Sequence, residues 1–178
     1  MHNINFTPFP NLTTGHYYLR KLEISDENEI FAIRSDVSVS KYLDRPKAKS
    51  IDEARQFIEK INNGITNNES IYWVITPKNE TKFIGSICLW NISREQSKAE
   101  IGFELFPAYQ GKGIMQEIIP PVIEFGFNDM KLDLIEGEVD PGNIKSIKLM
   151  EKFGFVYDKK LEDTVIYSLK NPNKDIKM

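Results

Sequence analysis

The 178-residue chain has little of what several classes of protein require. Its single cysteine, Cys88, cannot form an internal disulfide, which favours a reducing compartment. Its two histidines, His2 and His16, lie far apart in the sequence and no His/Cys cluster accompanies them, so no metal site is expected. The formal net charge of -3 provides no basic surface, so no nucleic-acid partner is expected either.

Targeting and nucleotide motifs are also missing. The first residues do not form the basic start and apolar block of a secretion signal, and no apolar run reaches the ~18 residues of a membrane span. We therefore expect a cytoplasmic protein with no membrane partner. The patterns GxGxxG and GxxxxGK[ST] do not occur, which disfavours dinucleotides and nucleoside triphosphates as ligands.

The composition that is present indicates one folded domain. Hydrophobic residues make up 40% and charged residues 28% of the chain, as in an ordinary globular protein. We expect a single domain over residues 1–170 and a flexible polar tail over residues 171–178. The apolar residues Phe6, Phe9 and Trp90 are candidates for the core or for an interface, so a homo-oligomer stays open.

Periodicity predicts alternating strands and helices. A capping box from Ser50 to Glu53 begins the second helix, and residues 62–64, Asn-Asn-Gly, are expected to end it. Pro120 and Pro121 interrupt a later apolar helix and predict a kink, unless packing absorbs it. The expected strands are residues 17–23, 72–76, 82–90, 99–105, 132–139 and 164–169, and the expected helices are residues 25–33, 50–62, the helix from 113 and 143–152.

Residues 99–115, AEIGFELFPAYQGKGIM, carry the clearest functional signal. They predict a strand, a short Gly-containing loop and the start of a helix. The first N–H groups of a helix lack partners and lie at the positive end of its dipole, so such a loop can bind phosphate. The strand places Glu100 and Glu104 on one face with Gly102 between them, so we expect a ligand to approach closely there.

Three stretches together resemble the GNAT superfamily of acyl-CoA-dependent N-acetyltransferases. The loop is similar to the signature Q/R-x-x-G-x-G/A, with Gln110, Gly113 and, in place of Gly or Ala, Met115 at its defined positions. The run NIKSIKLMEKFGF, from Asn143 to Phe155, is similar to the pattern N-x-x-A/S-x-x-x-Y-x-x-x-G-F. The N-terminal half, with YYLRKLEISDENEIFAI and SIDEARQFIEKI, looks like the RimJ/RimL-type branch, which includes ribosomal-protein N-terminal acetyltransferases.

The resemblance implies an α/β (α+β) fold. Its mixed, mostly antiparallel sheet of about seven strands would splay after the fourth strand, with about four helices around it. Acetyl-CoA is the implied co-substrate, and its pantetheine arm would pair with the backbone of that strand. Lys112 either adds charge at the pyrophosphate or is a solvated loop lysine. The implied cofactor-binding residues are Phe103, Glu104, Leu105, Gln110, Gly111, Lys112, Gly113, Ile114, Met115, Asn143 and Ser146.

The implied activity is acetyl transfer to a primary amine, which must be neutral to attack. An α-amino group is roughly 14% neutral at pH 7, against about 0.04% for a lysine side chain. A protein N-terminal α-amino group is therefore the favoured acceptor, with a small amine such as a polyamine or an aminoglycoside as the alternative. A non-catalytic CoA-binding module is a further alternative, because Met115 and Met150 replace residues that the family pattern has.

Glu100 is the candidate general base, because it occupies the place of a catalytic strand glutamate in several superfamily members. Glu104, on the same face, is the runner-up. The alternative interpretation is that Glu100 and Glu104 are only solvated carboxylates. Glu136 and Glu138 share a face of a later strand and could recognise a cationic acceptor, although a solvated face is the simpler interpretation.

Met150 stands where many relatives have a tyrosine that protonates the departing thiolate, and its thioether cannot donate a proton. A thiol pKa of ~8.5 makes the thiolate a tolerable leaving group, which lessens the need for an acid. By resemblance to RimL-type enzymes, Ser146 is the candidate proton donor. Tyr109 and Tyr157 are lower-ranked candidates.

Overall fold

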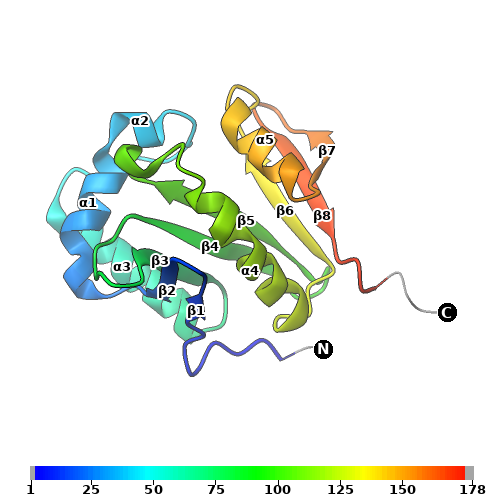
Figure 1. Ribbon diagram of the computed structural model, residues 1–178, viewed down its shortest axis with the longest axis horizontal. Helices are drawn as coiled ribbons and strands as arrows, with labels where there is room; N and C mark the ends of the chain where they lie inside the picture. The colour runs from blue at the N-terminus through cyan, green and yellow to red at the C-terminus, as the bar shows by residue number, and fades with distance from the viewer. Residues whose placement is uncertain (1–2, 175–178) are drawn as a thin grey trace.

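An eight-stranded sheet runs through the structure, a computed structural model that describes residues 3–174 (Figure 1). The strand order is β1-β2-β3-β4-β5-β6-β8-β7, and all neighbours are antiparallel except β5 and β6. The strands are β1 (Leu12–Thr13), β2 (Tyr17–Lys21), β3 (Ile71–Pro77), β4 (Gly85–Ser93), β5 (Lys98–Leu105), β6 (Leu134–Val139), β7 (Val156–Lys160) and β8 (Val165–Lys170). The helices are η1 (Ile24–Asp26), α1 (Glu27–Ser35), α2 (Val37–Ser40), α3 (Ile51–Thr66), η2 (Pro107–Tyr109), α4 (Ile114–Asn128) and α5 (Ile144–Lys152).

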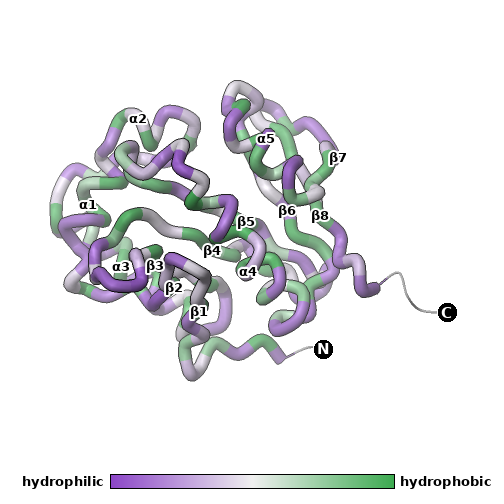
Figure 2. The backbone as a smooth tube through the Cα atoms, viewed as in Figure 1, coloured by the Kyte–Doolittle hydropathy of each residue, from purple (hydrophilic) through white to green (hydrophobic). Residues whose placement is uncertain are grey.

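Helices cover both faces of the sheet. Successive side chains of β3 point to opposite faces, so Trp73 packs on Phe125 of α4 while Tyr72 packs on Phe57 of α3. The ring centroids are 5.3 Å and 6.0 Å apart, respectively. Figure 1 shows α4 and α5 in front of the sheet, and Figure 2 shows hydrophobic residues concentrated along the strands between the helical layers.

The sheet opens between β5 and β6. Their parallel pairing covers only residues 98–100 of β5 and 134–136 of β6, and ends at the pair Glu100 and Glu136. Within residues 3–174, no strand pairs with residues 101–105 of β5 on the β6 side. The splay that the resemblance implies is therefore confirmed, although it follows the fifth strand because the short β1 precedes the others.

The sequence missed three short elements, which raise the described counts to eight strands and five α-helices. β1 has two residues, and β7 is exposed along its whole length, so neither shows an alternating apolar pattern. α2 has four residues and is held by its cap: the Asp36 carboxylate accepts from the N–H groups of Ser38 and Val39 at 2.8 and 3.0 Å.

The structure moves the end of one expected helix and shows how another accommodates its two prolines. α3 does not end at residues 62–64 but continues to Thr66, because Ile65 is buried and extends the apolar face by one position. α4 continues as one helix through Pro120 and Pro121. Its apolar face is buried against the sheet, and this packing offsets the lost backbone hydrogen bonds.

The chain remains attached to the sheet slightly beyond the expected domain boundary. Asn171 is buried, and its backbone and side-chain amides donate to the carbonyls of Asp133 and Leu132, both at 2.9 Å. Residues 175–178 of the expected tail lie outside the described residues. Phe6 belongs to the core, whereas Trp90 is 48% exposed. Of the described helices, none is long and apolar enough to cross a membrane.

Candidate active site

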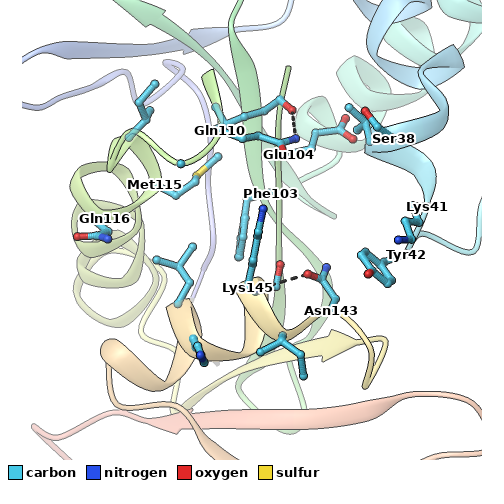
Figure 3. Close-up of a pocket in the computed structure, with 18 of the residues that line it drawn as sticks. Ser38, Lys41, Tyr42, Phe103, Glu104, Gln110, Met115, Gln116, Asn143 and Lys145 are labelled. Carbon is cyan, nitrogen blue, oxygen red and sulfur yellow. Dashed lines mark hydrogen bonds between the residues drawn. The ribbon is translucent and has the colours of Figure 1, made fainter. Parts of the chain in front are cut away.

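A cavity of about 890 Å³ lies where β5 ends (Figure 3). Its walls come from β5, the loop into α4, the first turn of α4, α5 and the segment that begins at α2. Glu100 and Lys112 are the predicted site residues that do not line the cavity. The ten predicted residues that do line it are Phe103, Glu104, Leu105, Gln110, Gly111, Gly113, Ile114, Met115, Asn143 and Ser146.

The loop before α4 presents backbone rather than side chains to the cavity. Gly111 and Gly113 have φ values of 72° and 77°, in the left-handed region that favours glycine. A Cβ added to either residue would meet no atom within 4 Å, so the space in front of the loop is open. Gly113 is the N-cap of α4, whose first N–H groups lack intrahelical acceptors. This arrangement fits a phosphate group.

The register of β5 decides which of its backbone groups face the opening. The N–H of Phe106, the residue after β5, donates to the carbonyl of Ile84 at 3.0 Å. Phe106 and Ile84 therefore form a hydrogen-bonded pair of the ladder between β5 and β4. Alternation along an antiparallel ladder then directs the backbone of Glu104 to β4, and that of Phe103 and Leu105 to the open side. In this register Glu104 lines the cavity with its backbone groups directed to β4 rather than to the opening.

Gln110 ties the loop to the end of β5. Its side-chain amide donates to the carbonyl of Leu105 at 2.9 Å, as the dashed line in Figure 3 marks. That carbonyl already has a partner, so Phe103 offers the better backbone contact. The same alternation directs the backbone of Ile101 toward β6, beside the last pair of the β5–β6 ladder, and Ile101 is not among the residues that line the cavity.

Two methionines stand where the family pattern has other residues, and each has a packing role. Met115 is 6% exposed, and Figure 3 shows its side chain extending from the start of α4 toward Phe103. Met150 is 3% exposed, and its Sδ would lie 2.5 Å from a Cβ added to Gly137 of β6. The absence of a side chain at Gly137 makes room for Met150, which does not line the cavity.

Glu100 lies at the apex of the opening, at the last position where β5 pairs with β6. The side-chain amide of Asn91 donates to its carboxylate at 2.6 Å. Asn91 belongs to the irregular part of β4, where the register shifts between Trp90 and Ser93, and its φ is 47°. Such a bulge can redirect a side chain, and here it accompanies the contact between Asn91 and Glu100.

The surroundings of Glu100 favour its protonated form. Burial raises the pKa of Glu100 above its usual range, and the carboxylates of Glu138 and Glu136 add to the rise. The hydrogen bond from Asn91 acts in the opposite direction and lowers the pKa. A carboxylate with a raised pKa is a stronger base than a solvated one.

Two of the neighbouring carboxylates have cationic partners. Glu104 accepts from Arg45 at 2.6 Å, which ties the segment after α2 to β5. Glu136 accepts from the ammonium of Lys98 at 2.9 Å. Glu100, by contrast, accepts from a neutral amide. Glu100 is therefore better suited than Glu104 to take up a further proton.

The predicted close approach of a ligand at Gly102 is not supported. A Cβ at that position would lie 3.2 Å from the Sγ of Cys88 and 3.7 Å from the indole nitrogen of Trp90. Gly102 thus makes room for side chains of β4. Burial raises the pKa of Cys88 to about 12, so the thiol is protonated at neutral pH and packs as a small apolar group.

Among the candidate proton donors, Ser146 lines the cavity, whereas Tyr109 and Tyr157 do not. The backbone N–H of Ser146 donates to the side-chain oxygen of Asn143 at 3.3 Å, so Asn143 caps the N-terminus of α5. The ammonium of Lys112 lies 5.9 Å from the ring centroid of Tyr109, outside the cavity lining.

The sequence analysis missed residues on three walls. Ser38, Lys41 and Tyr42 come from the segment that begins at α2, which has no apolar periodicity to reveal it. Three lysines of α5 and Gln116 of α4 also line the cavity. The lysines could have been found, because their spacing in the sequence places them on one face of the predicted helix.

A sheet that opens between two parallel strands, beside a glycine loop at a helix start, has the geometry of a class of proteins that fits an extended, phosphate-bearing ligand. Residues 16–156 match a family model described as an acetyltransferase (GNAT) domain. The chain therefore belongs to the GNAT acetyltransferase family. GNAT acetyltransferases use acetyl-CoA and act on amine acceptors, and the chain is accordingly an acyltransferase enzyme.

Individual relatives agree with this assignment. The chain is 32% identical over 152 residues to an uncharacterised N-acetyltransferase of Bacillus licheniformis, with 85% of each chain covered. It is also similar to the ribosomal-protein-S5-alanine acetyltransferase of Vibrio fischeri, at 27% identity, a TM-score of 0.79, and coverage of 92% of this chain and 98% of the other.

A third relative shares the fold. The spermidine N-acetyltransferase of Vibrio cholerae, solved with CoA and spermine, has 24% identity and a TM-score of 0.77, with 86% of this chain and 95% of the other covered. The S5-alanine enzyme agrees with the RimJ/RimL-type resemblance of the sequence. The two solved relatives act on different classes of amine.

Proposed function

We propose that this enzyme transfers the acetyl group of acetyl-CoA to a protein N-terminal α-amino group. The observation that carries the proposal is the position of Glu100: a carboxylate of raised pKa stands at the apex of the splayed sheet, beyond the inner end of the donor cavity. In this proposal the acetyl donor occupies the cavity, and the general base stands at the apex of the same opening between β5 and β6.

The donor would occupy the cavity described above. The N–H groups at Gly113 and the first turn of α4 would hold its pyrophosphate, and the backbone of Phe103 would pair with its pantetheine arm. The open space before Gly111 and the unpaired edge of β5 fit such a ligand. Acetyl-CoA supplies an acetyl thioester at this position.

The side chains divide the proton transfers between them. Glu100 takes the proton that the acceptor amine loses, directly or through water, which is the step that makes the amine nucleophilic. Ser146, on the cavity wall, would donate a hydrogen bond to the departing sulfur and relay to it a proton that solvent returns to the hydroxyl. Asn143 caps the helix that carries Ser146 and so fixes its position.

The α-amino acceptor is preferred because a moderately strengthened carboxylate suffices for it. An amine of pKa ~7.8 is partly neutral at physiological pH, whereas an amine with a pKa of about 10 needs far more assistance. The similarity to the S5-alanine acetyltransferase supports the same choice. A polyamine is the second candidate, favoured by the three carboxylates of Glu100, Glu136 and Glu138 on neighbouring strands.

An acetylation screen tests the proposal. Purified protein and acetyl-CoA are incubated with peptides bearing free N-termini, with polyamines and with aminoglycosides, and products are measured by mass spectrometry. We expect the peptides to have the highest kcat/KM. As a control, the same peptides with blocked N-termini should not react.

Other results would change the assignment. Preferred acetylation of spermine would move the acceptor to the second candidate. Binding of acetyl-CoA in calorimetry without turnover of any amine would contradict catalysis and support a CoA-binding module. Absence of acetyl-CoA binding would contradict both the proposed reaction and the module.

A further inference from the structure

The cavity has a charge opposite to that of the whole chain. The formal net charge is -3, yet four lysines line the cavity: Lys41, Lys145, Lys148 and Lys152. Glu104 is the one carboxylate in the described lining, and Arg45 already neutralises it at 2.6 Å. A concave site with an excess of one charge focuses the electrostatic potential, so this one attracts anions.

Three of these lysines form a stripe on α5. Lys145, Lys148 and Lys152 are spaced by three and four residues and therefore share one face of the helix. Neither Lys145 nor Lys148 forms an ion pair with a carboxylate among residues 3–174. Lys145 also lies in the first turn of α5, where the helix dipole disfavours a cation. Local stability does not explain its presence.

The stripe faces a second anion site across the cavity. The ammonium of Lys152 donates to the side-chain oxygen of Gln116 at 2.6 Å, and Gln116 belongs to the first turn of α4. The lysines of α5 are thus placed next to the helix start that would hold the pyrophosphate, but on the opposite wall. A ligand that carries a second phosphate group besides its pyrophosphate can use both walls at once.

We propose that Lys145, Lys148 and Lys152 bind the 3′-phosphate of coenzyme A, so that the enzyme selects CoA over 3′-dephospho-CoA. The inference rests on the proposed donor site, because it assumes that the pyrophosphate lies at the start of α4. A ribose 3′-phosphate is a dianionic monoester, and flexible ammonium groups suit it as point charges. The lysines at this site determine donor specificity and take no part in the acetyl transfer.

Calorimetric titration of the full chain with CoA and with 3′-dephospho-CoA tests the inference. The wild type should bind CoA roughly tenfold more tightly than 3′-dephospho-CoA, the difference expected for about one charged hydrogen bond to the 3′-phosphate. The preference should weaken as salt rises, since screening affects the dianion more. In the double variant Lys145→Gln/Lys148→Gln, the preference should fall to near unity while dephospho-CoA affinity stays constant.

The matched control is Lys159→Gln/Lys160→Gln, which removes the same charge from the exposed strand β7. It should keep the wild-type preference. The α5 variant should keep the wild-type Tm because lysine and glutamine have similar helix propensities, and the exposed β7 variant should keep it too.

Equal wild-type affinities for the two ligands would overturn the inference. An equal loss of affinity for both ligands in the α5 variant would also overturn it, because the lysines would then belong to the pyrophosphate site. A wild type that binds neither ligand would overturn the proposed function as well.

Discussion

The two sides of the opening are built in different ways. The donor side is built largely from short local segments, the loop with the start of α4 and the first turns of α5, each of which can be recognised within a few residues, and the lining is basic. The apex is assembled from three strands, with Asn91 on β4, Glu100 on β5 and Glu136 on β6, and it is acidic. A motif can therefore reveal the donor side, whereas the apex depends on strand register.

The contrast also separates binding from chemistry. Changes in the basic cavity should alter donor affinity and leave the pH dependence of turnover intact. Changes at the acidic apex should do the reverse, because they alter the proton affinity of Glu100 without touching the phosphate loop. Variants on each side can break or sharpen this division.

The largest effect is expected for Glu100→Gln. Loss of a general base lowers rates by about 10²- to 10⁴-fold. The loss in kcat/KM should be greatest below the acceptor pKa, where the amine is protonated, and should shrink above it. Affinity for CoA, measured by calorimetry, should not change. An unaltered pH–rate profile would remove Glu100 from the reaction.

The same variant has a stability signature that separates chemistry from misfolding. The pKa of Glu100 is raised in the folded state, so ionisation of this carboxyl opposes folding as the pH rises from its unfolded pKa to the raised one. A glutamine side chain at this position does not ionise and carries no such cost. The Tm of Glu100→Gln at neutral pH should therefore equal or exceed that of the wild type. The surface variant Glu124→Gln provides the control for removal of one negative charge.

A smaller effect, confined to the donor side, is expected for Gly113→Ala. A left-handed φ costs an alanine ~1 kcal/mol or more, and the new methyl group would stand in the open space before the helix start. CoA affinity should fall about tenfold, the cost of roughly one charged hydrogen bond, with an unchanged pH profile. Gly154→Ala, with φ of 88° at the end of α5, carries similar strain outside the cavity and should lower only the Tm.

The same division explains what the sequence could predict. The signature from Gln110 to Met115 and the helix from Asn143 identified the donor side, because each depends on residues within one turn and one loop. The splay was implied by resemblance alone, since the point at which two strands separate has no local pattern. Asn91 was missed for the same reason: its contact with Glu100 depends on a register shift in β4.

The smallest effect, and the sharpest test of the apex, is expected for Asn91→Gly. Glycine tolerates the φ of 47° at this position, so the substitution removes the side chain without backbone strain. The hydrogen bond from Asn91 favours the ionised form of Glu100, and its loss should raise the pKa of that carboxyl further. The acidic limb of the kcat/KM profile should move to higher pH, with a few-fold loss of activity at neutral pH and little change at higher pH.

Asn91→Asp should move the acidic limb in the same direction, because it places a negative charge beside the carboxylate of Glu100. CoA affinity should stay constant in both variants; a fall in CoA affinity would show that the apex and the donor cavity are coupled and that their division is wrong.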